Sequence, residues 1–530
     1  MTASKVVSAE AAVDLIADGD TVGILGCIGW VTPDAVLKAL SERFEKTRAP
    51  RDLTAFCPVG TGDMREILGI DHIAKEGLLK RAICGSWLNA RSPITGERPE
   101  LFRMLRGNLL ECYAWPMGAM MHWLREVARH SPGYLTSVGI GTYADPRLDG
   151  TRLNDCTPEG LVRVVEFEGE EQLFYPTWPV NVAIIRATSA DEMGNLSFEN
   201  EPLISSAIAL ALAAKASGGI VIAQVKHLCE PGRRRTQDCR FPGAYVDRVV
   251  VADTQTMGTY MVHDQRFLGG IPFDKASLAT MPEGLDKVLQ RRAMAEVEKH
   301  VVTIFGYGLA TCIPLVMAEE GLLNEHSLHE YLFTTEHGPY GGVVMPGAYF
   351  SPNIYADALF DGPTQFDAID GGLCKTAFLS FGQFDAQGNI NVSRLGDTIV
   401  GAGGFIDIAH NAEKLVLVGT FTAGGLEADV EDGMLSIRQE GRARKFVERA
   451  EHITYPALQG VRQRGQQVKI ITERATFELR ENGLLLTEIA AGVDLQKDIL
   501  DQMAYPPAAI ADPLPRSTLP STRAATEAQS

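Results

Sequence analysis

Segments rich in Val and Ile alternate along this chain with segments whose apolar residues recur at helical spacing. The stretch "DGDTVGILG" (18–26) predicts a turn followed by a buried strand. Thr32 and Pro33 are then expected to cap and open a helix over "PDAVLKALSERF" (33–44). The apolar face of that helix would hold Val36, Leu37, Leu40 and Phe44. This alternation favours an α/β fold with mainly parallel central sheets.

The second half of the chain repeats the plan of the first half. "VVTIFGYGLATCIP" (301–314) has the strand, the Gly-bearing loop and the proline of "TVGILGCIGWVTP" (21–33). "DEMGNLSF" (191–198) matches "DAQGNINV" (385–392), 194 residues later, with Asp, Gly, Asn and an aliphatic residue in the same places. Each copy predicts a tight turn between two apolar stretches. We therefore expect two related α/β domains fused in one chain.

Shifts in composition predict where these domains begin and end. Gly and Pro cluster near residues 267–288, before a charged run with helical spacing. The prediction is an N-terminal domain over 1–270, a linker over 271–288 and a C-terminal domain over 289–504. Residues 505–530 are rich in Pro, Ser, Thr and Ala, and are expected to form a tail or a strap along the surface.

Charge and hydropathy narrow the function classes. The 530 residues carry a formal net charge of -18, which argues against a nucleic-acid partner because phosphate backbones require an excess of Lys and Arg. Glu10, Asp14 and Asp18 interrupt the stretch where a secretory signal would carry its apolar core. The most apolar stretch, 203–225, is broken by Lys215, so we expect a helix and a strand there and no membrane span. We expect a cytoplasmic protein that acts on small molecules.

Cysteine spacing and glycine-rich loops give little support for a metal or a resident cofactor. None of the nine cysteines has C-x-x-C spacing, so reduced thiols are expected. His227, Cys229 and Cys239 are the nearest approach to a ligand set, but ordinary loop positions explain them as well. The glycine-rich loops match neither the phosphate loop nor the dinucleotide fingerprint. We expect no metal and no tightly bound cofactor.

One glutamate stands out in the stretch "FTTEHGPYGGVVMPG" (333–347). A strand followed by a loop explains the Gly and Pro residues, but it does not explain Glu336. One interpretation is a solvated carboxylate in a turn. The other is a nucleophile toward an activated acyl group, since the surroundings are apolar and Gly338 removes side-chain bulk. "GAGGF" (401–405) would then supply oxyanion donors, although such a loop alone is typical of a tight turn.

Three stretches carry a family resemblance. "TTEHGPYGGV" (334–343), "GAGGFIDIAHNAEKLVLVGTFTAGGLE" (401–427) and "LREVARHSPGYLTSVGIGTYADPR" (124–147) resemble the corresponding stretches of the family I CoA-transferases. The chain looks most like the single-chain acetate, propionate and 3-oxoacid enzymes of that family, which belong to short-chain fatty acid and ketone body metabolism. The resemblance implies two related α/β domains of the CoA-transferase type, fused here in one chain.

The resemblance also implies a ping-pong reaction centred on Glu336. This carboxylate would attack an acyl-CoA thioester and later carry CoA as a glutamyl-CoA thioester. Coenzyme A is then a substrate, and the partner substrate is a short- or medium-chain carboxylic acid. Relatives assemble as homodimers or homotetramers, and the same is expected here. The residues implied for the oxyanion and for CoA binding are Gly401, Gly403, Gly404, Gly306, Tyr307 and Gly308.

The chain departs from the family pattern in the expected acyl pocket. The family commonly reads Pro-Gln-Gly where this chain has "WPMG" (115–118), so Met117 replaces a glutamine amide. A thioether cannot donate a hydrogen bond. Together with Gly118 and Trp30, Met117 would shape a pocket for a larger or less polar acid, while core packing is the other interpretation.

Two further functions stay open on the sequence alone. An acyl-CoA hydrolase would use the same glutamate with water as the acceptor, and the altered environment of Met117 motivates that alternative. A non-catalytic acyl-CoA sensor would keep the domains without turnover. Retention of both Glu336 and the "GAGGF" loop argues against a sensor.

Overall fold

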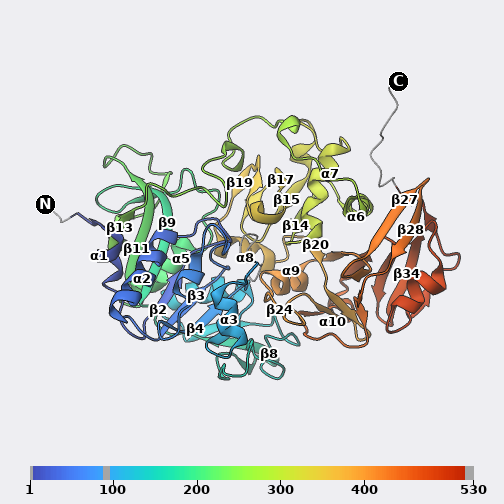
Figure 1. The fold of residues 1–530 in the computed structure, drawn as a ribbon, viewed down its shortest axis with the longest axis horizontal. Helices are drawn as coiled ribbons and strands as arrows, with labels where there is room; N and C mark the ends of the chain where they lie inside the picture. Colours follow the sequence, from blue (N-terminus) through green and yellow to red (C-terminus); the bar gives the residue numbers. More distant parts are fainter. Residues whose placement is uncertain (1–3, 88–95, 520–530) are drawn as a thin grey trace. The chain divides into compact units, whose positions relative to one another are not determined.

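The computed structural model describes residues 4–87 and 96–519, and its chain divides into two compact units. The first unit comprises Met1–Gly270, Leu359–Asp367 and Thr398–Asp407. The second unit comprises Ile271–Ala358, Ala368–Asp397 and Ile408–Ser530. Figure 1 colours the first unit mainly blue to green and the second mainly yellow to red. Each unit is built on its own large sheet.

The sheet of the first unit is parallel along its main path. Its strands follow the order β1 (Val6–Val7), β13 (Arg248–Val251), β11 (Ile220–Leu228), β9 (Val182–Ala190), β2 (Thr21–Ile24), β3 (Leu53–Cys57), β4 (Leu79–Cys84) and β5 (Glu111–Ala114). Every neighbouring pair along this path is parallel. All nine residues of β9 are buried, as expected for a parallel strand covered on both faces. Two short strands, β10 (Leu196–Ser197) and β12 (Cys239–Phe241), pair antiparallel beside β9.

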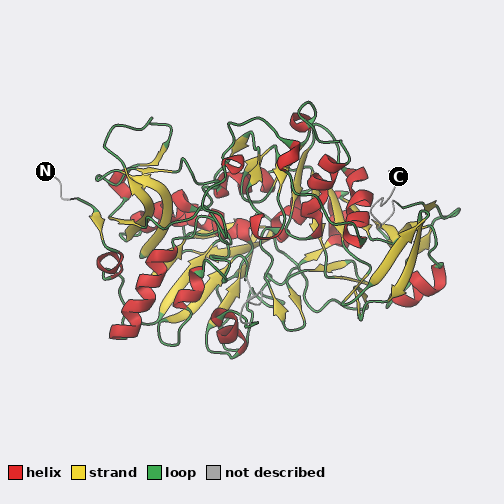
Figure 2. Ribbon diagram, turned by 45° about the horizontal axis from the view of Figure 1, so that its top comes forward, coloured by secondary structure: helices red, strands yellow, loops and turns green. Residues whose placement is uncertain are grey.

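Helices cover this sheet, and a small antiparallel sheet of β6 (Gly133–Thr136), β8 (Glu170–Pro176) and β7 (Arg163–Phe167) adjoins it in the chain. The helices are α1 (Ala9–Val13), α2 (Asp34–Thr47), α3 (Glu100–Arg106), α4 (Met117–Ala128) and α5 (Ala207–Ala216). Helix α5 packs on β9 and β11, and α4 packs on α5. Figure 2 shows the helices bordering the strands.

Helix α2 confirms the predicted amphipathic helix but corrects how it begins. The four predicted core residues, Val36, Leu37, Leu40 and Phe44, are all buried. Thr32 does not cap the helix, because its Oγ1 donates to Ile28 O at 3.1 Å. Pro33 occupies the cap position without a side-chain hydrogen bond. The helix therefore starts at Asp34, whose carboxylate lies in the first turn, where the helix dipole favours a negative charge.

The sheet of the second unit is mixed. Its strands follow the order β19 (Ala358–Leu359), β16 (Pro339–Tyr340), β15 (Leu332–Thr334), β14 (Val302–Phe305), β20 (Thr376–Ser380), β25 (Lys414–Val418), β32 (Gln467–Ile471), β33 (Ala475–Arg480), β34 (Gly483–Ala490) and β35 (Ala509–Ile510), with β36 (Arg516–Ser517) also beside β34. The five strands from β15 to β32 are parallel. Their carboxyl ends therefore share one edge of the sheet, which is where ligands bind in open α/β sheets.

Short helices and strands complete the second unit. Helix α6 (Leu285–Ala293) packs on β25 and β32, and α7 (Ile313–Glu319) begins near Pro314, as the alignment with Pro33 predicted. Helix α10 is Ala457–Arg464, while α8 (Gly362–Asp370) and α9 (Phe405–Asn411) contain residues of both units. The short strands are β17 (Val343–Val344), β18 (Asn353–Ile354), β21 (Gln383–Asp385), β22 (Asn389–Asn391), β23 (Arg394–Leu395), β24 (Thr398–Ile399), β26 (Thr422–Ala423), β27 (Glu427–Glu431), β28 (Met434–Gln439), β29 (Ala443–Arg444), β30 (Phe446–Val447) and β31 (Tyr455–Pro456).

The repeated sequence motif forms the same turn twice. In the first unit, Asp191 Oδ1 accepts hydrogen bonds from the backbone N–H groups of Met193 and Asn195, and Asp191 Oδ2 accepts from Asn195 Nδ2. In the second unit, Asp385 Oδ1 and Oδ2 accept the equivalent bonds from Gln387 and Asn389. The intervening glycines have φ of 84° and 76°, which explains why glycine occupies both positions. The internal repeat is thus confirmed at the level of individual hydrogen bonds.

Aromatic side chains form much of both cores. In the first unit, the ring of Trp115 packs on Phe56, Trp123, Tyr175 and Trp178. In the second unit, a cluster is formed by Phe381, Phe384, Phe421, Phe446 and Phe477. Among the residues described, no helix has the length and apolar character that crossing a membrane demands.

Candidate active site

Glu336 lies in the turn that joins β15 to β16. Gly338 has φ of 101°, which favours glycine, and its N–H donates to Thr335 O at 3.3 Å. Thr335 Oγ1 anchors the turn by donating to Ser351 O at 2.6 Å. These contacts hold Glu336 at the carboxyl end of β15, where only 7% of the residue is exposed.

The Glu336 carboxyl group is buried without a counter-ion in hydrogen-bonding contact. Its Oε2 is shielded from solvent and has no hydrogen-bond partner among the described residues. His337 Nε2 lies 3.7 Å from Glu336 Oε1, which is too long for a hydrogen bond. Burial raises the pKa of Glu336 to about 7 and lowers the pKa of His337 to about 3, so this imidazole is neutral near pH 7. The burial contradicts the interpretation of Glu336 as a solvated turn carboxylate.

The loop Gly306–Gly308 follows β14 at the same edge of the sheet, and its glycines are required by close packing. A Cβ on Gly306 would lie 2.4 Å from Leu379 Cδ2. Gly308 has φ of 124°, and a Cβ there would lie 2.5 Å from Ser380 Oγ. The loop backbone therefore lies directly against β20, and a side chain at either glycine would displace it.

Phe350 connects this loop with the glutamate turn. The ring of Tyr307 is 61% exposed and lies edge-on to Phe350, with the ring centroids 5.4 Å apart. The ring of His337 lies edge-on to Phe350 as well, at 6.1 Å. The structure thus brings the predicted Gly306–Gly308 loop and the Glu336 turn together around one aromatic ring.

The loop containing Gly401, Gly403 and Gly404 belongs to the first unit. Gly403 N–H donates to Gly85 O at 2.9 Å, and Ala402 N–H donates to Tyr143 Oη at 3.1 Å. A Cβ on Gly401 would lie 3.2 Å from Ala114 Cβ. Because Gly403 N–H is already engaged, the oxyanion donors expected of this loop would have to come from Gly401 and Gly404.

Met117 and Gly118 lie beside that loop in the same unit. Met117 N–H donates to Gly403 O at 3.0 Å, and Gly118 N–H donates to Asp407 Oδ2 at 3.2 Å. A Cβ on Gly118 would lie 2.2 Å from Asp407 Oδ1, so a larger residue does not fit. The Met117 side chain is 2% exposed. Three predicted residues, Met117, Gly118 and Gly403, are therefore neighbours.

Trp30 has a different setting within the first unit. Its side chain is buried, its ring centroid lies 5.1 Å from that of Phe267, and its ring atoms approach Gly258 closely enough that a Cβ there would lie 2.8 Å away. These contacts are those of a core residue. Glu336 and the Gly306–Gly308 loop belong to the second unit, whereas Trp30, Met117, Gly118 and the Gly401–Gly404 loop belong to the first.

The sequence did not single out Ser380, which ends β20 beside Gly308. Its Oγ is shielded from solvent and has no hydrogen-bond partner among the described residues. Buried polar atoms in proteins are nearly always hydrogen-bonded, so this hydroxyl is an exception beside the glycine loop. Serine is common at strand ends, so the sequence alone could not distinguish Ser380 from other serines.

Comparison with known proteins decides the family. A sequence profile described as Coenzyme A transferase matches residues 6–252. The acetate CoA-transferase YdiF of Escherichia coli (strain K12) is 38% identical over 504 residues, which cover 95% of this chain and 92% of that protein. The chain belongs to the CoA-transferase family.

Two further CoA-transferases extend this finding. The caffeate CoA-transferase of Acetobacterium woodii is 38% identical over 521 residues, covering 96% of both chains. A crystal structure of the acyl-CoA transferase YdiF of Escherichia coli O157:H7, in a thioester complex with CoA, matches with a TM-score of 0.87 and 36% identity, covering 97% of this chain and 95% of that chain. The predicted family, enzyme class and α/β fold are confirmed.

Proposed function

We propose that this CoA-transferase moves CoA between a short- or medium-chain acyl-CoA and a free carboxylate through a glutamyl-CoA thioester on Glu336. The observation that carries the proposal is a buried glutamate whose Oε2 has no hydrogen-bond partner among the described residues, at the carboxyl edge of a parallel sheet. A relative that is 36% identical forms a thioester complex with CoA, which supports a covalent route.

The proposed reaction has two halves. The Glu336 carboxylate attacks the thioester carbonyl of the acyl-CoA, the C–S bond breaks, and CoA leaves as a thiolate with an acyl-glutamyl anhydride remaining. The thiolate then attacks the Glu336 carbonyl of the anhydride, which releases the first acid as a carboxylate and leaves glutamyl-CoA. The acceptor carboxylate attacks this thioester, and the returning thiolate takes the new acyl group and frees Glu336. Each step exchanges one activated acyl bond for another.

Burial gives Glu336 its proposed reactivity. A pKa of about 7 makes the carboxylate more basic than a solvated glutamate, and a desolvated anion is a better nucleophile. We assign oxyanion stabilisation to the N–H groups of Gly401 and Gly404, and we assign the Gly306, Tyr307 and Gly308 loop to the CoA moiety. We assign Gly403 a structural role in the Gly401–Gly404 loop, because its N–H already donates to Gly85 O.

The acids that donate and accept CoA are inferred from relatives and from the residues of the expected acyl pocket. One relative is named for acetate, a small acid, and another for caffeate, an aromatic acid. We assign Met117 and Gly118 to the wall of the acyl pocket, leave Trp30 to core packing against Phe267, and expect less polar acids to be preferred. We also propose a cytoplasmic homodimer or homotetramer with related domains over 1–270 and 289–504, a linker over 271–288 and a tail from residue 505.

Mass spectrometry tests the covalent intermediate. Incubation with acetyl-CoA and no acceptor should add the mass of CoA to the proteolytic peptide that contains Glu336. Glu336→Gln should abolish the adduct, whereas Glu325→Gln, a change of the same kind at an exposed glutamate, should retain it. Turnover of the parent enzyme with an unmodified Glu336 peptide would reject the proposal.

An acyl-CoA hydrolase that uses the same glutamate is the second candidate. Met117, in place of the amide common in the family, leaves one fewer hydrogen-bond donor beside the Gly401–Gly404 loop. Thiol release from acetyl-CoA without any carboxylate acceptor, at a rate equal to the transfer rate, would favour the hydrolase. Release that is strictly dependent on an added acid supports the transferase.

A further inference from the structure

Three polar side chains lie along the carboxyl edge of the second unit's sheet. Glu336 follows β15, Ser380 ends β20, and Lys445 lies beside Gly419, the residue that follows β25. Strands β15, β14, β20 and β25 are adjacent and parallel, so these positions share one edge. Glu336 belongs to the proposed acyl-CoA site and Ser380 lies beside Gly308 of that site, whereas nothing so far assigns a role to Lys445.

The Lys445 residue is buried, and its ammonium group lies against an aromatic ring and a glycine. The residue is 7% exposed, and its Nζ lies 3.8 Å from the centre of the Phe381 ring. A Cβ on Gly419 would lie 2.6 Å from Nζ, so the ammonium fills the space that a side chain there would occupy. Among the described residues no hydrogen bond or ion pair is made by Nζ. Burial lowers the pKa of Lys445 to about 7, and the charge of Glu473 opposes this effect.

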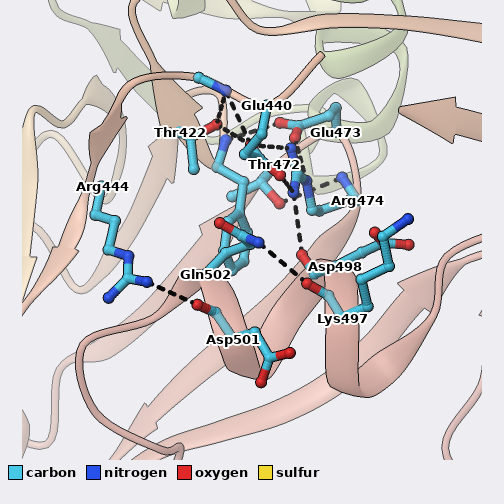
Figure 3. Close-up of polar contacts among 12 residues, drawn as sticks. Thr422, Glu440, Arg444, Thr472, Glu473, Arg474, Lys497, Asp498, Asp501 and Gln502 are labelled. Carbon is cyan, nitrogen blue, oxygen red and sulfur yellow. Dashed lines mark hydrogen bonds and ion pairs between the residues drawn. The ribbon is translucent and has the colours of Figure 1, made fainter. Parts of the chain in front are cut away.

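The neighbouring acidic groups are already engaged with Arg474 and with the backbone. Figure 3 shows Glu473 and Glu440 converging on the Arg474 guanidinium. Arg474 Nε donates to Glu473 Oε1 at 2.7 Å, and its two terminal nitrogens donate to the Glu440 oxygens at 2.8 and 3.0 Å. The other Glu473 oxygen accepts from Phe421 N–H at 2.8 Å. Glu473 therefore acts on Lys445 only as a charge at a distance.

A buried lysine without a hydrogen-bonded partner is unfavourable for folding, since most such groups are paired. Anions bind where a desolvated cation and backbone dipoles meet, and the carboxyl edge of a parallel sheet is where substrates of α/β proteins bind. We infer that Lys445 binds an anionic oxygen of the substrate, at the β20–β25 end of the edge that carries Glu336. The inference rests on the proposed CoA-transfer site and extends it.

Strand spacing limits which oxygen Lys445 can bind. Lys445 lies between the second and third strands counted from β15, which at about 4.8 Å per strand places it roughly 12 Å along the edge from the glutamate turn. The reacting thioester is therefore too close to Glu336 to be the ligand. A CoA phosphate at the end of a bent pantetheine arm, or the far carboxylate of an extended medium-chain dicarboxylic acid such as suberate, presents an anionic oxygen at about this distance. The chemistry is the same in both, and the two sources can be separated experimentally.

Binding measurements in the Glu336→Gln background test the inference without covalent chemistry. The probes are CoA against pantetheine, which lacks the phosphates, and suberate against octanoate, which lacks the second carboxylate. Adding Lys445→Met should weaken binding of the anionic member of one pair by about ten-fold or more, while its neutral-ended partner changes by less than two-fold. Lys375→Met, which removes an exposed lysine at the amino end of β20, is the matched control and should change neither.

Proton uptake provides a second readout that a purely structural lysine would not change. At pH 8 the Lys445 amine of the ligand-free protein is mostly neutral, and binding of an anion should draw up to one proton onto it. Calorimetry in buffers of different ionisation enthalpy measures this uptake. At pH 5.5 the uptake should vanish, because the amine is already charged. This measurement uses the intact lysine and so remains informative if the Lys445→Met protein does not fold.

The outcomes separate this inference from the proposed function. Equal weakening of all four probes, no weakening, or no proton uptake at pH 8 would overturn the role of Lys445 while leaving the Glu336 thioester untouched. Failure of the thioester experiment, with selective loss of CoA or suberate binding in Lys445→Met, would leave the anion site standing.

Discussion

The second unit buries charged side chains in two contrasting ways. Arg474 is fully buried, and its guanidinium donates to Glu473, to both oxygens of Glu440 and to the Asp498 carbonyl oxygen, as Figure 3 shows. Glu336 and Lys445 are nearly as deeply buried, yet among the described residues Glu336 Oε2 has no hydrogen-bond partner and neither group has a counter-ion in hydrogen-bonding contact. The same sheet thus carries one saturated charge cluster and two unsatisfied charges.

The pKa values register this difference. Burial alone would raise the pKa of Glu440, but the hydrogen bonds from Arg474 outweigh it and hold the pKa below its usual range. Burial is unopposed by any cation at Glu336 and raises its pKa to about 7, and it lowers the pKa of Lys445 to about 7. Groups that change charge near neutral pH are suited to chemistry and ligand binding, whereas a saturated cluster serves the fold. Four experiments exploit this contrast.

Removing the unsatisfied carboxylate should have the largest effect. Glu336→Gln keeps the size of the side chain but loses the nucleophile, so CoA transfer from acetyl-CoA should fall by at least about 1,000-fold. Thermal unfolding at pH 7 should show a protein at least as stable as the parent. A variant that keeps more than a tenth of the activity would mean that Glu336 is not the nucleophile.

Breaking the saturated cluster should do the opposite. Arg474→Met leaves Glu473 and Glu440 buried without their cation, which should lower the free energy of unfolding by about 3–5 kcal/mol in urea titration. Arg480→Met, which removes an exposed arginine paired with Glu478, should change it by less than about 1 kcal/mol. Equal effects of the two changes would show that the buried cluster is not a structural element.

The sequence predicts the strands and turns of this fold better than it predicts the surroundings of individual polar and charged side chains. Apolar runs mark β9 and β20, and the Asp-x-x-Gly-Asn motif predicts both equivalent turns, because strand burial and turn chemistry are local properties. The cap of α2 was wrongly assigned to Thr32, because its hydroxyl donates to an acceptor in the preceding loop. The local sequence does not reveal which acceptor a hydroxyl group will bind in the folded chain.

The sequence likewise identifies one charged residue of the candidate site and misses another. Glu336 could be found from sequence because an acidic residue interrupts an apolar and glycine-rich stretch. Lys445 could not, since it lies among "GRARKF", where exposed basic residues surround it. Its burial depends on Phe381 and Gly419, which are distant in sequence. Long-range packing, rather than local composition, decides which basic residue of such a run is buried without a hydrogen-bond partner.

The pH dependence of stability should reveal the raised pKa of Glu336. The folded chain holds this proton up to about pH 7, whereas an unfolded glutamate loses it near pH 4.5. The contribution is therefore fully present below pH 4.5 and is lost as the pH rises through 7. Relative to the parent, Glu336→Gln should gain up to about 3 kcal/mol of unfolding free energy between pH 4.5 and 8. A constant difference across this range would contradict the raised pKa.

His337 should contribute least, because its imidazole is neutral and lies 3.7 Å from the Glu336 carboxyl oxygen. His337→Asn keeps a polar N–H near the carboxylate and should change kcat/KM by less than about three-fold. His337→Leu removes that dipole, so the carboxylate is less favoured and the rising limb of the kcat/KM profile near pH 7 should move up by less than about one pH unit. The resulting loss at pH 7 stays below about ten-fold and disappears at pH 9, where Glu336 is ionised in both proteins. A loss that persists at pH 9 would instead mean that His337 contacts the reacting groups directly, and that Glu336 is less isolated than the contrast with Arg474 implies.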